Sequence, residues 1–294
     1  MTSKVFELST NGDWAAIFFL LTAIFMNLRR HIGSPKFALI NIWAVRIFCS
    51  LFFSFLVNAC SEEPKPIPLL MVTVLLVLFL IESMRLWRLT NIFAKIDIPV
   101  FPRFRQCTES FVWPIGKFFD QTRQLILTHK FSEKTLLKIG NDDCFVMYSP
   151  IFYGDNQHSR LQIIFDFLRN GCPMLNCILT SFTRDGKTIV TNNLQTVFAS
   201  FYPQSWDVKR YPMASLEKLL KIHASRIAKK KTIVIDGENS WETINGEQHQ
   251  IELENCEAGL CEKLEENDNV TLTYMGRYHL WCDMLNYRYF GGNS

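Results

Sequence analysis

An almost uninterrupted apolar stretch early in the chain decides the environment in which the protein can fold. Residues 37–60 hold 24 positions and a single charged side chain, that of Arg46. About 20 apolar residues in a helix are enough to cross the roughly 30 Å hydrocarbon core of a bilayer. The sequence therefore predicts a membrane-spanning helix over residues 37–60.

Two further apolar runs flank this span. Residues 67–81 are uncharged and dense in leucine and valine, and the run reaches spanning length at residue 87 if Glu82 and Arg85 lie near the interface. Residues 14–28 are also uncharged, and a span over 12–28 places the flanking polar residues near the headgroups. We expect about three spans within a transmembrane region of residues 1–88.

A cleaved signal peptide is the alternative interpretation of the first run. It fits poorly, because the run ends at Arg29 and Arg30 rather than at small residues. Basic residues are retained on the cytoplasmic side of a membrane. They precede the second span and follow the third, whereas the loop between these spans holds Glu62, Glu63 and Lys65. We therefore expect a multi-pass protein of the cell membrane with a cytoplasmic C-terminal domain.

A charged side chain such as that of Arg46 costs free energy when it lies deep in a bilayer, and charged residues at such positions are often functional. One interpretation is that it snorkels along its helix or faces a polar partner on another helix, such as Asn41 or Glu82. The other is a conduction or transport pathway, for which three short spans with one internal charge offer little support.

Residues 89–130 form a connector rich in aromatic and basic residues and interrupted by Pro99, Pro102 and Pro114. Rings mixed with cations suit the headgroup region of an anionic leaflet. Packing of the same rings into the following domain is an equally good interpretation of this pattern.

Residues 131–294 are predicted to form a soluble α+β domain with a small antiparallel sheet. Residues 1–131 hold 14 lysine and arginine residues against 8 acidic ones, a net charge of +6, whereas the remainder holds 17 against 20, a net charge of −3. A nucleic-acid-binding protein should instead carry its positive charge on the soluble domain. The lipid bilayer is therefore an expected partner and nucleic acid is not.

Local patterns assign most elements of this domain. We expect a strand over 143–153, broken at Pro150, and a helix from Ser159 to Gly171 whose apolar residues recur at helical spacing. The Asp185-Gly186 pair predicts a tight hairpin over 177–193 with a type I′ turn.

The second half of the domain reads as mainly helical. Ser215 is a candidate helix cap, a short strand follows over 232–236, and helices are expected from Gly246 through Leu264 and over 274–290. The sequon at Asn269 would remain unused on the cytoplasmic side.

Cysteines carry no clear metal site. Cys172 and Cys177 form one pair at a four-residue separation, and Cys256 and Cys261 form another. In a helix, five residues turn the second pair through about 500°, so its thiols point about 140° apart and cannot converge on one metal. Glycine-rich phosphate-binding motifs are also missing from the sequence. We expect no metal and no cofactor.

Asn255-Cys256-Glu257 resembles the Asn-Cys-Glu tripeptide of the membrane-tethered LRAT-like acyltransferases. The resemblance covers three residues and implies Cys256 as a thiol nucleophile. That family places its histidine on a strand followed by a glycine-containing stretch, and neither His158 nor His223 has this setting.

Two functions from different classes follow. The first is a membrane-anchored cytoplasmic interaction or regulatory module that binds a protein partner or further copies of itself. The second is a membrane-tethered enzyme acting on a lipid or acyl substrate, with a cysteine or aspartate paired to His158, His223 or His279. No motif in the sequence identifies a catalytic residue for the second.

Overall fold

The computed structural model divides the chain into two compact units, residues 1–89 and 90–294. It describes residues 2–28, 35–61, 63, 65–95, 103–107, 113, 115–139, 147–167, 173–194, 201–203, 205–212, 214–235, 240–263 and 270–290.

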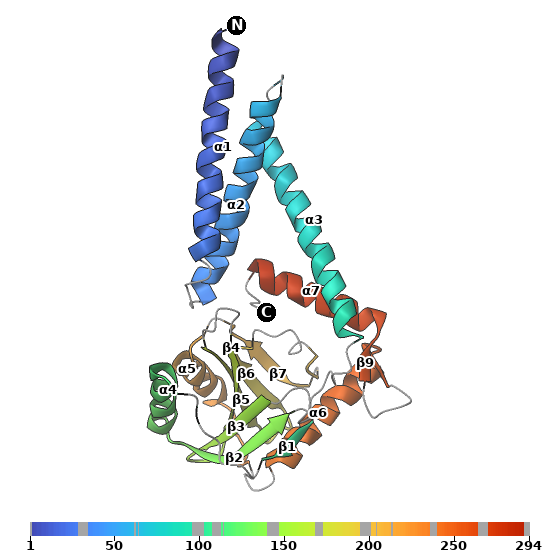
Figure 1. The fold of residues 1–294 in the computed structure, drawn as a ribbon. Coiled ribbons are helices and arrows are strands. Elements are labelled where there is room, and N and C mark those ends of the chain that lie inside the picture. Colours follow the sequence, from blue (N-terminus) through green and yellow to red (C-terminus); the bar gives the residue numbers. More distant parts are fainter. Residues whose placement is uncertain are drawn as a thin grey trace. The chain divides into compact units, whose positions relative to one another are not determined.

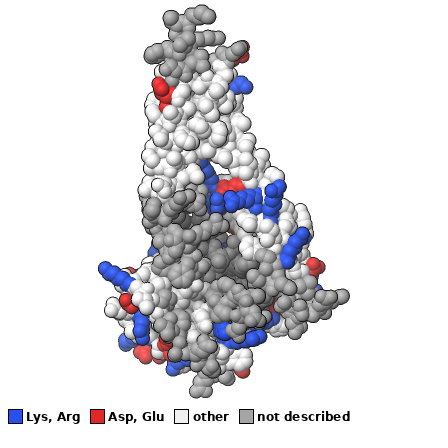
Figure 2. Space-filling view, in the orientation of Figure 1, with Lys and Arg blue, Asp and Glu red and all other residues white. Residues whose placement is uncertain are grey.

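The first unit consists of three long helices, α1 (Thr2–Leu28), α2 (Pro35–Cys60) and α3 (Ile67–Phe93), the last of which ends just inside the second unit. Each contains a segment long and apolar enough to cross a membrane, of 19, 21 and 27 residues respectively. The three predicted spans each fall within one of these helices. Much of their surface carries neither acidic nor basic groups (Figure 2). These features are compatible with a multi-pass membrane protein.

Aromatic rings pack α1 against α2. Trp14 lies 6.3 Å from Phe55, and Phe25 lies 5.3 Å from Phe48, measured between ring centroids. Higher residue numbers on α1 pair with lower ones on α2, so the two helices run antiparallel. Small side chains such as Ser50 let helices approach closely inside a membrane, and Ser50 is fully buried.

The second unit is built on a seven-stranded sheet in the described part of the chain, with strands in sequence order from β1 to β7 (Figure 1). The strands are β1 (Phe104–Gln106), β2 (Phe131–Ile139), β3 (Met147–Gly154), β4 (Arg160–Phe167), β5 (Pro173–Phe182), β6 (Thr188–Asn192) and β7 (Asp207–Arg210). Neighbours are antiparallel except β6 and β7, which are parallel. The expected small antiparallel sheet is thus a larger, mixed one.

Residues 160–167 form a central strand, so the predicted helix from Ser159 is wrong. Leu161 and Ile163 alternate with Arg160 and Gln162, and all four are buried, which fits a strand covered on both faces. Short apolar runs satisfy helical and strand periodicities alike. Here pairing with β3 and β5 decided between them.

The expected break at Pro150 is also wrong, because β3 continues through it. Paired positions between β3 and β4 begin at Ile151, so the missing N–H of Pro150 falls where this ladder has ended. The Ser149 hydroxyl, next to the proline, donates to the carbonyl oxygen of Ile163 at 2.9 Å and so joins β3 to β4 beyond the paired positions.

The hairpin between β5 and β6 is confirmed, but its turn type is not. Gly186 has a φ of 78°, whereas Asp185 does not have the positive φ that a type I′ turn requires. The Gly186 N–H donates to the Thr183 carbonyl at 3.0 Å. This arrangement is a type I turn followed by a left-handed glycine.

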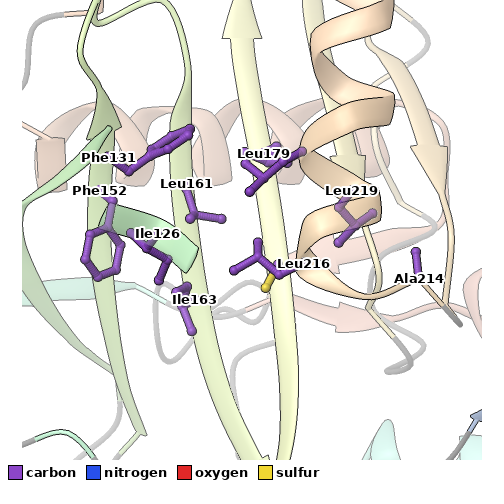
Figure 3. Close-up of a cluster of buried hydrophobic side chains, with 11 residues drawn as sticks. Ile126, Phe131, Phe152, Leu161, Ile163, Leu179, Ala214, Leu216 and Leu219 are labelled. Atoms are coloured by element: carbon purple, nitrogen blue, oxygen red, sulfur yellow. The ribbon is translucent and has the colours of Figure 1, made fainter. Parts of the chain in front are cut away.

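One face of the sheet carries an ordinary apolar core. Helices α4 (Lys117–Thr128) and α5 (Leu216–Ile227) cover it, and the predicted Ser215 cap accepts from the Lys218 N–H. Figure 3 shows the side chains that meet there: Ile126, Phe131, Phe152, Leu161, Ile163, Leu179, Ala214, Leu216 and Leu219. In Figure 1, α4 and α5 lie together on this side and α6 lies on the other.

Residues of the predicted connector belong to this domain. Phe104 and Phe119 are buried in its cores, and the Trp113 ring lies 5.4 Å from that of Phe165. Of the two interpretations of the aromatic residues in 89–130, packing into the domain holds for these three rings.

The C-terminal part adds α6 (Ser240–Glu257), β8 (Cys261–Lys263), β9 (Val270–Leu272) and α7 (Tyr274–Phe290). The helix expected through Leu264 ends at Glu257, because the chain turns there into β8. The helix predicted over 274–290 is confirmed. A Cβ on Gly276 would meet the carbonyl oxygen of Leu260 at 2.0 Å, so glycine is what allows α7 to lie this close to the turn before β8.

Candidate functional site

The face of the sheet that α6 covers is apolar at one end and polar at the other. Near β1 to β3 it is apolar, with Leu137 and Ile151 packed against Ile244 of α6. Across β4 to β7 the same face buries arginine, glutamine and asparagine side chains. We call the second part the polar face and define it as Arg160, Gln162, Asn176, Asn192 and Arg210 with Glu247 and Tyr202.

Strand register places the members of the polar face beside one another. Gln162 pairs with Ile178, Ile178 with Asn192, and Asn192 with Arg210, which makes one row across four strands. Asn176 precedes Ile178 by two residues and therefore points to the same side. Successive side chains of a strand point to opposite faces of the sheet. The leucine and isoleucine side chains point toward α5, and these polar side chains point toward α6.

Arg160 and Glu247 form a buried ion pair with two parallel hydrogen bonds. Arg160 Nη1 donates to Oε1 of Glu247 at 2.8 Å, and Nη2 donates to Oε2 at 2.5 Å. The two side chains are 3% and 12% exposed. Burial opposes the charged form of Arg160, but Glu247 outweighs it and raises the pKa of the guanidinium. Arg160 is therefore charged and neutralised within the fold.

Arg210, on β7, has fewer partners. Its Nη2 donates to the Leu194 carbonyl at 3.2 Å, and no carboxylate of the described residues lies within ion-pair distance. Burial and Glu247 raise the pKa of Tyr202 to about 12 against the opposing effect of Arg210. Tyr202 thus keeps its proton at neutral pH and supplies no compensating charge.

Several buried atoms of the polar face have no hydrogen-bond partner in the described part of the chain. They are Arg210 Nε, Asn192 Nδ2 and Asn176 Oδ1. Leaving a buried donor or acceptor unpaired costs about 1–3 kcal/mol, so native structures hold few of them. Their concentration on one face marks it as the candidate binding site of this domain.

Comparisons with protein-family models, with curated proteins and with solved structures find no match to this chain.

The three candidate histidines lie in three different places. His158 is half-buried in the turn before β4, His223 is on α5, and His279 on α7 has its ring 5.5 Å from that of Phe201. No hydrogen bond between described residues joins any of them to a cysteine. The predicted cysteine–histidine pair is not assembled among these residues.

His223 belongs to a buried polar network on the α5 side of the sheet. Its Nε2 lies 2.9 Å from Ser181 Oγ and its Nδ1 lies 2.9 Å from Thr191 Oγ1. Burial and the charge of Arg226 lower the pKa of His223 to about 4. The ring is 2% exposed and neutral at pH 7, so this network joins α5 to the sheet and is closed to solvent.

The pKa of His223 predicts a loss of stability in acid. An unfolded histidine has a pKa of about 6.5, so below that value protons favour the unfolded chain, and the loss continues until the pH reaches the folded pKa of about 4. Between pH 7 and 4.5 this linkage should cost about 2 kcal/mol.

Thermal unfolding of the detergent-solubilised chain at several pH values measures this effect. His223→Gln, which keeps hydrogen-bonding groups but does not titrate, should show a shallower dependence on pH. His279→Gln is the matched control, because His279 is exposed. An unchanged acid sensitivity in His223→Gln would contradict the assignment.

Three cysteines of the domain have raised pKa values, which disfavours the reactive thiolate. Burial raises the pKa of Cys261 to about 12, and burial together with Glu252 raises the pKa of Cys256. Burial raises that of Cys177 as well. A nucleophilic thiol instead needs a lowered pKa.

The cysteine pairs considered for metal binding do not form a site in the described residues. Cys256 lies on α6 and Cys261 on β8, and Cys172 lies outside the described residues. No group of three or more histidine, cysteine or acidic side chains that could hold a metal ion occurs among the residues that the structure describes.

Arg46 finds one of the two partners expected for it. Its Nη2 donates to Glu82 Oε2 of α3 at 2.6 Å, and its guanidinium lies 5.1 Å from the centroid of the Trp43 ring. Ser50, Ser54 and Asn58 continue from Arg46 at four-residue intervals and are buried. The sequence analysis identified Arg46 but missed the rest of this polar stripe on α2.

The residues of the polar face also escaped the sequence analysis. Arg160 and Gln162 fall on the solvated side when their segment is read as a helix, and on the buried side when it is a strand. A usable signal was present: asparagine is depleted in strands, yet Asn176 and Asn192 interrupt otherwise strand-like runs.

Proposed function

We propose that this chain is a membrane-anchored regulatory module of the cell membrane, in which residues 90–294 form a cytoplasmic domain that binds a small polar ligand on the polar face. The observation that carries the proposal is the set of buried, unpaired polar atoms on Asn176, Asn192 and Arg210. Binding rather than catalysis is favoured because the thiols of Cys177, Cys256 and Cys261 have raised pKa values and His223 is buried and neutral.

The cytoplasmic position of the domain is supported by the charges that flank the spans. Arg29, Arg30 and Lys36 lie on the same side as the domain in a three-span arrangement, and Arg85 and Arg88 lie at the end of α3. The short loop that follows α2 would face the other side. A partner protein, or another copy of the chain, would then receive the ligand signal at the cytoplasmic surface.

Translation into microsomes tests the topology. The sequon at Asn269 should remain unglycosylated, because glycosylation occurs only on the lumenal side, and protease added outside the microsomes should digest the domain. An N-terminal extension that carries a second sequon is the internal control, since three spans place it in the lumen and should allow its modification. Glycosylation at Asn269, or a protease-protected domain, would contradict the cytoplasmic assignment.

A further inference from the structure

The polar face contains a compact group of hydrogen-bond donors on adjacent strands. Asn192 on β6 and Arg210 on β7 are directly paired positions, and neighbouring strands lie about 4.8 Å apart. Asn176 on β5 lies one diagonal step from Asn192 on the same side of the sheet. Three side chains from three consecutive strands therefore project from the same side of the sheet.

Two of these three side chains are withheld from bulk water. Asn192 is fully buried and Asn176 is 2% exposed, while Arg210 is half-buried and forms the part of the group nearest to solvent. Asn192 Nδ2 and Arg210 Nε have no partner within the described ranges. The amide of Asn176 presents its oxygen, and a half-turn of that amide presents its Nδ2 instead.

The charges of the polar face restrict the class of ligand that it can bind. Glu247 neutralises Arg160, Tyr202 is protonated, and Arg210 has no acidic partner among the residues described, so the polar face holds one uncompensated positive charge. An arginine edge matches the two oxygens of a carboxylate or phosphate with two parallel hydrogen bonds. A group with one negative charge and at least two acceptor oxygens fits both the charge and the donors.

We propose that the polar face binds a singly charged oxyanion, a carboxylate or a phosphodiester, through Arg210 and Asn192, with Asn176 completing the site. This inference rests on the proposed function in taking the domain as a ligand-binding module. Arg160 and Glu247 form the neutral wall of the site. Tyr202 is a protonated member of the polar face whose pKa responds to both Arg210 and Glu247.

Binding is measured on the full chain in an uncharged detergent. Sodium acetate and sodium dimethyl phosphate are the probes, sodium chloride at equal ionic strength is the reference, and thermal midpoints and titration calorimetry are the readouts. At least one of the two anions should raise the midpoint above the chloride reference and should give a saturable isotherm. No response to either anion would overturn the proposal.

Variants test whether the response arises at the polar face. Arg210→Met and Asn192→Asp should each weaken binding by about 10- to 100-fold, the range expected for loss of charge-assisted hydrogen bonds. Arg210→Lys keeps the charge but not the planar edge, and it should weaken binding by less than Arg210→Met. Arg123→Met, on the exposed side of α4, is the matched control and should bind as the wild type does. Equal binding by Arg210→Met and Arg123→Met would overturn the proposal even if the wild type responds.

A neutral probe separates the ligand class from the proposed function. Acetamide has the shape of acetate without its charge. Stabilisation by acetamide but by neither anion would overturn the anionic class and leave a ligand-binding domain, whereas no response to any probe would count against both. Neither result depends on the side of the membrane that the domain faces, so the microsome experiment remains independent.

The source of the oxyanion is decided with lipid. The chain is placed in nanodiscs of phosphatidylcholine with and without phosphatidylglycerol, and dimethyl phosphate is titrated into both. Competition between dimethyl phosphate and phosphatidylglycerol supports a headgroup phosphodiester as the ligand. Equal binding in both nanodiscs supports a soluble ligand with the same oxyanion.

Discussion

Replacing Glu247 with alanine should destabilise the domain by about 3–5 kcal/mol, because it leaves the charge of Arg160 buried without a partner. The guanidinium cannot escape the cost by losing its proton. Its side chain is only 3% exposed, so water cannot take the place of the carboxylate without local opening of the sheet. For a domain of this size the loss corresponds to a fall in thermal midpoint of about 6–20 °C.

Thermal unfolding of the detergent-solubilised chain, followed by tryptophan fluorescence, measures this change. Glu257→Ala is the matched control, because Glu257 is exposed on the same helix and should shift stability by no more than about 0.5 kcal/mol. The double variant Arg160→Met/Glu247→Leu should recover most of the loss, since a buried ion pair and an apolar pair of similar volume are often close in stability. A Glu247→Ala midpoint within 2 °C of the wild type, as about 0.5 kcal/mol would give, would contradict a buried pair.

The ion pair between Arg46 and Glu82 in the first unit should respond in the same way to the loss of one partner. Glu82→Leu leaves the guanidinium of Arg46 at depth in α2, where a charged side chain costs about 3 kcal/mol by insertion scales. We expect less protein in the membrane fraction and a lower temperature at which the solubilised chain aggregates. The cation–π contact between Arg46 and Trp43 remains in this variant, but it is worth only about 1–2 kcal/mol.

Arg46→Leu/Glu82→Leu removes both charges and should restore insertion to the wild-type level or above it. Arg85→Leu is the control, because Arg85 is exposed on the same helix three residues away. If Glu82→Leu and Arg85→Leu behave alike, the 2.6 Å contact between Arg46 and Glu82 does not contribute to stability in the bilayer.

The sequence was sufficient to predict an element wherever the residues that determine that element lie within one short segment. Each apolar run of the first unit forms a helix long and apolar enough to cross a membrane, and a helix satisfies the backbone hydrogen bonds within one segment. Ser215 begins α5 and Gly186 ends the turn between β5 and β6 because caps and turns are decided by a few adjacent residues.

The pairing of Glu82 with Arg46 could also be predicted from the sequence. Only a few polar side chains in three spans can neutralise a buried guanidinium, and Glu82 is the acidic one near the end of the third predicted span. The second expected candidate, Asn41, is buried without a hydrogen-bond partner in the described part of the chain.

Sequence alone determined the apolar helices, the hairpin, the α5 cap and the final helix, because each depends on contacts within one short segment. Tertiary structure decided that residues 160–167 are a strand and that β6 and β7 run parallel, because strand pairing depends on backbone contacts between different segments, which no single segment specifies by itself. It also assembled the polar face: Arg160, Asn176, Asn192 and Arg210 come from four strands, and only the register of the strands places them on one side of the sheet.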